Sequence, residues 1–274
     1  MPVYETITSR KNPLVTRMAK LGERKFRDLE GLFRLDGVKL FSEAVRSGVG
    51  IEYVFATKAK LNELSELIVS SGARAFEVTD EVLEKLTDEK APQGIVAAAR
   101  KFPTLPEGEL PEGGFRSLLL SSIRDPGNLG TIVRTAYAFG IDRIYLSRDC
   151  ADIYSPKTIR AAMGTIFRQK LTLVGDEIEL VGRLKSAGCE VYAAALRQGA
   201  RSLGSFTLPE RVCFAVGNEG HGLDDRLIDA CSGTVIIPMV SGCESLNAAE
   251  AAGILAWEMS RDYFKERDDD PKIH

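Results

Sequence analysis

The sequence has few of the residues on which several common kinds of catalytic site depend. Only 2 of its 274 residues are histidine, and one of them, His274, is the last residue. A catalytic triad centred on histidine is therefore not expected. The 5 cysteines are scattered and none belongs to a C-x-x-C pair. Their pattern argues against a zinc site or a disulfide framework, so we predict no bound metal and a reducing compartment.

Long apolar runs and nucleotide-binding fingerprints are also lacking. No apolar run approaches the ~20 residues of a membrane-spanning helix, and no charged-then-apolar leader precedes the chain, so a cytoplasmic protein with no membrane partner is predicted. Gly217, Gly220 and Gly222 are spaced as G-x-x-G-x-G, which is not the dinucleotide pattern, and no P-loop is present. Enzymes that use a nicotinamide cofactor or a nucleoside triphosphate are therefore not expected.

The overall charge does not predict a nucleic-acid partner, but one stretch is strongly basic. Net charge is -3, whereas seven cations and a single acid, Glu23, lie between residues 8 and 27. Asn12 and Pro13 are predicted to begin an amphipathic helix there. The basic stretch is typical either of a solvated charged face or of a phosphate-binding surface, and the sequence leaves both open. The candidate RNA-binding residues are Arg10, Lys11, Arg17, Lys20, Arg24, Lys25 and Arg27.

Strand-like and helix-like segments alternate along the chain, which predicts an α/β protein. Residues 1–100 form a smaller first domain, and residues 117–266 a second domain that begins with a buried strand. Between them, residues 101–116 have the proline and glycine content of a linker. Residues 267–274 are predicted to be an acidic tail.

Two apolar strands of the second domain each end in a loop with small and polar residues. The loops follow Val216 and Ile237, and ligands of open α/β sheets bind beyond the carboxyl ends of strands. We therefore predict a ligand site there. A third segment, a helix predicted over residues 129–139, carries Arg134 on a face of small residues. That arginine is either solvated or placed beside a ligand.

Three ordered motifs in this domain resemble the signatures of the SpoU (TrmH-type) RNA ribose methyltransferases of the SPOUT superfamily. The first is the segment from Asp125 to Arg134, the second Val216 to Gly220, and the third Ile237 to Asn247. The segment from Tyr154 to Gly164 is also similar, and the first domain is similar to the substrate-binding domain of many members. One departure is Asp36-Gly37, where glutamate-glycine is more usual.

The resemblance implies a C-terminal SPOUT α/β domain with a parallel sheet and a trefoil knot, and a smaller N-terminal α/β domain that binds the RNA substrate. It also implies S-adenosyl-L-methionine as cofactor, a ribose 2′-hydroxyl as methyl acceptor, and a homodimer that shares the site. The implied cofactor-binding residues are Val216, Gly217, Ile237, Met239 and Leu246. The implied catalytic or site-forming residues are Asn128, Arg134, Glu219, Ser245 and Asn247.

Several alternatives stay open at this point. Ribosomal RNA is the preferred substrate over transfer RNA because of the additional N-terminal domain, and the methylated nucleotide is undetermined. A non-catalytic RNA-binding or ribosome-assembly protein, or a relative that methylates bases, would have a similar fold. The family arginine is often assigned as a general base; our hypothesis is that Arg134 mainly holds the target phosphate and polarises the hydroxyl.

Overall fold

The computed structural model describes residues 4–108, 113–218, 220–240, 242 and 245–265. Contacts divide the chain into two compact units: the first contains residues 1–103 with 152–168, and the second contains residues 104–151 with 169–274. The division near residue 103 falls inside the segment predicted to be a linker, and the strand that follows it begins at Phe115. Among the described ranges, no helix has both the length and the apolarity needed to cross a membrane.

The first unit contains a mixed five-stranded sheet. Its order is β1-β4-β3-β5-β2, and β5 is the strand that runs antiparallel to both of its neighbours. The strands are β1 (Glu5–Ile7), β2 (Leu32–Asp36), β3 (Ile51–Ala56), β4 (Arg74–Val78) and β5 (Ile95–Arg100).

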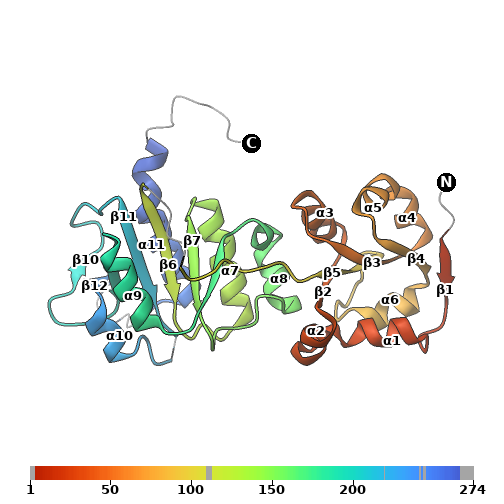
Figure 1. The fold of residues 1–274 in the computed structure, drawn as a ribbon, viewed down its shortest axis with the longest axis horizontal. Coiled ribbons are helices and arrows are strands. Elements are labelled where there is room, and N and C mark those ends of the chain that lie inside the picture. Colours follow the sequence, from red (N-terminus) through yellow and green to blue (C-terminus); the bar gives the residue numbers. More distant parts are fainter. Residues whose placement is uncertain (1–3, 109–112, 219, 241, 243–244, 266–274) are drawn as a thin grey trace. The chain divides into compact units, whose positions relative to one another are not determined.

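Short helices cover both faces of this sheet. Figure 1 shows α3, α4 and α5 on one side and α1 and α6 on the other. As predicted, Pro13 is the first residue of α1, and the Asn12 side chain accepts a hydrogen bond from the Leu14 amide at 2.9 Å. Residues 58–71 form two short helices that meet at Leu64. The helices are α1 (Pro13–Ala19), η1 (Lys20–Gly22), α2 (Arg24–Glu30), α3 (Val38–Arg46), α4 (Lys58–Glu63), α5 (Ser65–Ser71), α6 (Asp80–Leu86), α8 (Pro156–Ala162) and η2 (Thr165–Phe167).

An aromatic cluster holds residues 152–168 in the first unit. The ring of Phe33, which is fully buried in β2, lies 5.5 Å from that of Tyr154 and 6.2 Å from that of Phe167. Phe102 completes the cluster, with its ring centroid 5.0 Å from Tyr154. Such tilted ring pairs add to the free energy gained by burying apolar area. The cluster therefore explains why a segment remote in sequence joins this unit.

The second unit contains a seven-stranded sheet whose described strands pair in parallel. Its order is β10-β12-β9-β11-β6-β7-β8. The parallel sheet confirms the predicted fold class. The strands are β6 (Phe115–Leu120), β7 (Arg143–Ser147), β8 (Leu171–Val174), β9 (Glu190–Ala194), β10 (Arg201–Ser202), β11 (Arg211–Val216) and β12 (Gly233–Ile236).

Helices lie on both faces of this sheet as well (Figure 1). α9 and α10 pack on one face, whereas α7 and α11 pack together on the other. α7 begins at Pro126, three residues earlier than predicted, because the Asp125 carboxylate accepts a hydrogen bond from the Asn128 amide at 2.8 Å and caps the helix. The helices are α7 (Pro126–Ala138), α9 (Glu177–Ser186), α10 (Asp225–Ala230) and α11 (Ala248–Lys265).

Strand β11 lies between β9 and β6 in this sheet. Val212, Cys213, Phe214 and Ala215 are each at most 1% exposed, as expected for a parallel strand that is covered on both faces. Because all these strands are parallel, the carboxyl ends of β9, β11 and β12 meet at the same edge of the sheet. The polar loops predicted from the sequence follow two of these ends.

Candidate active site

A cavity of about 420 Å³ lies beyond the carboxyl ends of β9, β11 and β12. That volume is within the range of about 300–1,000 Å³ that is usual for small-molecule sites. The five predicted cofactor-binding residues all line it, and so does Ser245. The two strand ends singled out in the sequence therefore meet at one cavity. The lining residues that it predicted are Val216, Gly217, Ile237, Met239, Ser245 and Leu246.

Glycine is required at position 217 by the close approach of the chain to itself. A Cβ atom there would overlap the carbonyl group of Gly222 and would lie 2.6 Å from the backbone nitrogen of Leu223. Gly222 in turn donates its amide to the carbonyl oxygen of Asn218 at 2.8 Å. The loop thus turns back tightly and leaves main-chain groups at the wall of the cavity.

Asn218 ties the same loop to the end of β6. Its Oδ1 accepts a hydrogen bond from the amide of Gly220 at 2.8 Å, and its Nδ2 donates to the carbonyl oxygen of Ser122 at 3.0 Å. Ser122 has a left-handed backbone, with φ of 58°, which is uncommon for a residue with a side chain. Glu219, a predicted catalytic residue in this loop, lies outside the described residues.

Hydrogen bonds among Ser122, Ser147 and Asp149 support the turn at Ser122. The Ser122 amide donates to Oγ of Ser147 at 2.8 Å, and the Ser147 hydroxyl donates to Oδ1 of Asp149 at 2.6 Å. The Ser122 hydroxyl donates to the other oxygen of the same carboxylate. These hydrogen bonds lower the pKa of Asp149, because they stabilise its charged form. The turn that receives Asn218 is consequently held from β7 as well.

Asn128 and Asn247 bring the first and third motifs together. Nδ2 of Asn247 donates to Oδ1 of Asn128 at 3.2 Å. Oδ1 of Asn247 accepts from the amide of Ala249 at 2.8 Å and so caps α11. Ser245 and Leu246 stand just before this cap and line the cavity. The amide pair therefore fixes the first turn of α7 against the first turn of α11.

Arg134 is exposed on α7 and does not line the cavity described above. Thr131 and Ala138, three residues before and four residues after it, are also exposed, so this face of the helix has small neighbours. Arg134 makes no hydrogen bond or ion pair with the residues that the structure describes. Its guanidinium is available to a ligand that approaches from solvent.

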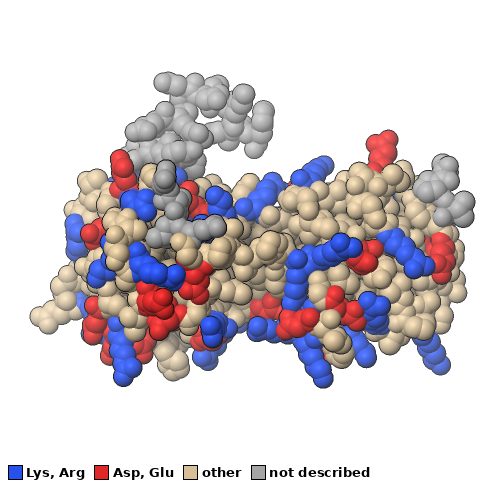
Figure 2. Space-filling view, viewed as in Figure 1, with Lys and Arg blue, Asp and Glu red and all other residues tan. Residues whose placement is uncertain are grey.

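The cations of the basic stretch in the first unit fall into three groups, of which the third contains Arg27 alone and is described in the next paragraph. Arg10, Lys11, Lys20 and Lys25 are exposed and form no ion pair with described residues. Arg17 pairs with Glu30 at 2.7 Å and Arg24 lies 3.8 Å from Asp28, so two acids just beyond the basic stretch offset part of its charge. Figure 2 likewise shows cations and acids interspersed on the face that it draws.

The prediction that Arg27 contacts RNA is wrong. Its side chain is only 3% exposed, and its Nη2 lies 2.6 Å from Asp152. Nη1 donates to the carbonyl oxygens of Leu21, at 2.9 Å, and Gly22, at 2.7 Å. The guanidinium is thus fully used inside the first unit. Sequence inspection missed this role because the partner acid lies 125 residues away.

Some cavity residues had no predicted role. Ala194 at the end of β9 and residues 195–197 after it line the cavity, and Asn218 and His221 line it from the loop after β11. Arg197 forms an ion pair with Asp225 at the start of α10. The loop after β9 contains no recognisable motif. Its position at the shared strand edge was the one signal that could have identified it.

Comparison with known proteins agrees with this arrangement. A family model described as the SpoU rRNA Methylase family matches residues 116–257, and the MRM3-like substrate binding domain matches residues 12–97. The chain therefore belongs to the SpoU rRNA methylase family.

Individual relatives match along most of their length. The chain is 34% identical to the 23S rRNA (guanosine(2553)-2'-O)-methyltransferase RlmP of Bacillus subtilis, over 92% of this chain and 98% of that protein. It is 27% identical to the 23S rRNA (uridine(2479)-2'-O)-methyltransferase of Streptomyces viridochromogenes, over 97% of this chain and 95% of that protein. Its fold resembles that of an AdoMet-bound rRNA methyltransferase from Sinorhizobium meliloti, with a TM-score of 0.86, 30% identity, and coverage of 94% and 98%.

Proposed function

We propose that this protein transfers a methyl group from S-adenosyl-L-methionine to a ribose 2′-hydroxyl of ribosomal RNA. The observation that carries the proposal is the cavity at the ends of β9, β11 and β12, which contains all five residues predicted to bind the cofactor. Relatives of similar length act on 23S rRNA, and a solved relative binds AdoMet. These names favour ribosomal RNA over transfer RNA.

The cavity residues fit the cofactor chemically. The absence of a side chain at Gly217 lets main-chain groups come close to a ligand, while Ile237, Met239 and Leu246 provide apolar surface for an adenine ring. The bound cofactor supplies an electrophilic methyl group. The chain therefore has to bind and orient the cofactor and the RNA, and to hold the acceptor hydroxyl in line with the methyl group.

We infer that Arg134 and Ser245 hold the target phosphate and that Asn128 and Asn247 keep the two helix starts in place. A guanidinium gives up its proton only far above neutral pH, so removing that proton near pH 8 costs about 6–8 kcal/mol. Correct placement of two reactants contributes about 7–11 kcal/mol. Positioning by Arg134 is therefore a sufficient role, and it does not require the arginine to act as a base.

A homodimer that shares the site forms part of the proposal. α7 and α11 present Tyr137, Ile254 and Trp257 to solvent, with exposures of 39%, 39% and 47%. Tyr137 is on α7, the helix that carries Arg134, and Ile254 and Trp257 are on α11, which packs against it. Sedimentation of the wild type and of Trp257→Glu tests these side chains as a dimer contact: the wild type should sediment as a dimer and the variant as a monomer with reduced methyl transfer.

The proposal also includes the trefoil knot implied by family membership. Its support is the insertion of β11 between β9 and β6, together with the bond from Asn218 in the loop after β11 to Ser122.

The function is tested by methyl transfer to RNA. The protein should transfer a labelled methyl group to ribosomal RNA from cells that lack it, and digestion to nucleosides should yield a 2′-O-methylated ribose. Calorimetric binding of the cofactor without transfer to any RNA would favour a non-catalytic RNA-binding protein. A methylated base, or transfer only to tRNA, would also contradict the proposal.

A further inference from the structure

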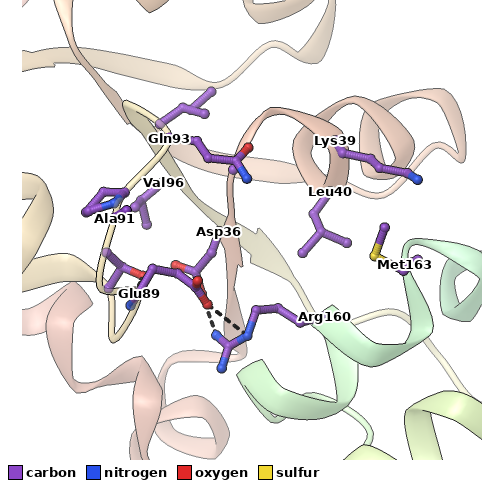
Figure 3. A pocket seen from close by; sticks show the side chains of 13 residues that line it. Asp36, Lys39, Leu40, Glu89, Ala91, Gln93, Val96, Arg160 and Met163 are labelled. Atoms are coloured by element: carbon purple, nitrogen blue, oxygen red, sulfur yellow. Dashed lines mark hydrogen bonds and ion pairs between the residues drawn. The ribbon is translucent and has the colours of Figure 1, made fainter.

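A cavity in the first unit takes no part in the methyl transfer proposed above. Its volume is about 200 Å³, and it lies where the end of β2, the start of α3, the segment before β5 and the helix α8 meet (Figure 3). Leu40, Val96 and Met163 form apolar walls. Drug-sized ligands usually need about 300 Å³ or more, so the cavity suits a smaller flat group.

Asp36 places a buried acceptor at this cavity. Its side chain is only 5% exposed, and its Oδ2 accepts hydrogen bonds from Nε of Arg34 at 3.2 Å and Nη1 of Arg160 at 3.1 Å. Oδ1 is buried and accepts no hydrogen bond, although Nε of Arg34 lies 3.2 Å from it. Buried acceptors are nearly always satisfied, so Oδ1 has capacity for one more donor, which a ligand in the cavity supplies after a small movement of the carboxylate.

Two further polar side chains line the same cavity. Glu89 pairs with Nε of Arg160 at 3.0 Å through one carboxylate oxygen. The exposed amide of Gln93 makes no hydrogen bond with the described residues. A Cβ atom at Gly37 would lie 2.7 Å from Oε1 of Gln93, and Gly37 has φ of 89°. Glycine therefore leaves the room that this amide occupies.

We propose that this cavity binds an unstacked guanine base of the RNA substrate. The inference rests on the proposed function and names the base that the first unit recognises. Sequence-specific RNA recognition relies on unstacked bases that are held between apolar surfaces and read along their edges. The apolar walls receive the faces of the base, and the carboxylates of Asp36 and Glu89 accept hydrogen bonds from its edge.

Guanine fits this set of acceptors better than other ligands. Carboxylates accept and do not donate, and guanine presents two adjacent donors, N1–H and the 2-amino group. Uracil has one donor between two carbonyl oxygens, and adenine and cytosine each present a single amino group. The carboxylates of Asp36 and Glu89 have no proton to donate to a phosphate. Lys39, which is exposed at the cavity, is suited to the phosphate that follows the base.

Fluorescence anisotropy with short RNA tests the inference on the full chain. The probes are pentaribonucleotides of uridine with guanosine, inosine or adenosine at the centre, and inosine differs from guanosine only by the missing 2-amino group. Saturating S-adenosylhomocysteine keeps the second cavity from binding the bases. The guanosine probe should bind about tenfold more tightly than either of the others.

Two variants and one control locate the preference. Asp36→Asn and Gln93→Ala should each reduce the preference for guanosine to about twofold or less. Glu66→Gln, which removes an exposed acid on α5 outside the cavity, should leave it unchanged. Because Asp36 also bonds two arginines, circular dichroism must show that its variant is folded. If it is not, Gln93→Ala decides the result, since that side chain is exposed.

Three results would overturn the inference: equal binding of the three probes by the wild type, an unchanged preference in both variants, or binding of guanosine monophosphate that the guanosine probe does not compete for. The last result would assign the cavity to a free nucleotide. Calorimetry with S-adenosylhomocysteine tests the proposed function separately. If that titration shows no binding, the methyl-transfer proposal fails, and the guanine site is then decided by whether Asp36→Asn and Gln93→Ala lose the preference, because neither residue lines the second cavity.

Discussion

Nδ2 of Asn247 donates a hydrogen bond to Oδ1 of Asn128 across 3.2 Å, although the two residues are 119 positions apart in the chain. The bond connects the N-terminal turns of α7 and α11, and Asn247 is at the same time the cap of α11. One side chain therefore serves both the stability of a helix and the geometry of the candidate site.

Replacing each asparagine by alanine should separate these two roles. Asn128→Ala should reduce kcat/KM about tenfold or more, because it frees the first turn of α7. Asn247→Ala should cause a similar loss and should also lower the free energy of unfolding by about 1 kcal/mol through loss of the cap. Methyl-transfer kinetics and urea unfolding measure both effects. Full activity in Asn128→Ala would show that the amide pair does not position the site.

Gly217→Ala should abolish cofactor binding. The added methyl group would overlap Gly222 and would lie 2.6 Å from the Leu223 nitrogen, so the loop must move at a cost of about 1–3 kcal/mol. The matched control is Gly182→Ala in α9, where a Cβ would meet nothing within 4 Å. That substitution should stabilise the protein by about 0.5–1 kcal/mol and leave cofactor affinity unchanged. Calorimetric titration with S-adenosyl-L-methionine distinguishes them.

Substitutions at Arg134 test whether it positions the RNA. Arg134→Lys keeps a cation and should retain weak methyl transfer, whereas Arg134→Ala should abolish it. Cofactor affinity should be unchanged in both, because Arg134 does not line the cofactor cavity. Complete loss of activity in both variants, with unaltered RNA affinity, would instead favour a role as general base.

Salt dependence should identify the cations of the first unit that contact RNA. Changing Arg10, Lys11, Lys20 and Lys25 together to alanine should weaken RNA binding and reduce the log–log salt slope by about 3, at about 0.7 per phosphate contact. Arg27→Ala is the contrasting variant. It should cost about 3–5 kcal/mol of stability because it leaves Asp152 unpaired, and it should not alter the slope in protein that remains folded.

Glu177 should make stability depend on pH. Burial chiefly raises the pKa of this carboxyl group, and the charges of Asp149, Asp176 and Asp224 raise it further, while a hydrogen bond from Ser121 opposes them. The folded state holds this proton more tightly than the unfolded state does. Above the raised pKa the carboxyl group is charged and lowers the free energy of unfolding. Below the unfolded value near 4.3 the group is protonated in both states, and this cost is absent.

Glu177→Gln should accordingly raise the urea midpoint at pH 7, and the gain should disappear as the pH falls below about 4. Glu179→Gln is a control from the same helical turn, because its side chain is exposed. An equal gain in both variants, or a gain for Glu177→Gln that persists in acid, would contradict the assignment.

The sequence predicted those features that depend on local patterns. Apolar runs located β11 and β12, and Pro13 marked the first residue of α1. These signals arise from residues that are neighbours in the chain. They were enough to predict an α/β protein and to place a candidate ligand site at two strand ends, whereas the parallel sheet was implied by the family resemblance.

Features that depend on distant partners were not accessible in the same way. Nothing near Arg27 indicates that it pairs with Asp152, and nothing near Asn128 indicates its bond to Asn247. The cavity beside Asp36 needs Arg160 and Met163 from a helix more than a hundred residues further along the chain. Only the folded chain brings these groups together.

The central position of β11 has a consequence for biosynthesis. Its neighbours β6 and β9 are both synthesised before it. The strand that joins them in the sheet is therefore missing until residue 216 has left the ribosome. A product truncated before residue 211 would lack β11 and β12, so β6 would expose one unpaired edge and β9 both of its edges, and the cofactor cavity would be absent. Incomplete chains are therefore inactive as methyl-transfer enzymes and prone to aggregate, and the cell gains no partial enzyme from interrupted translation.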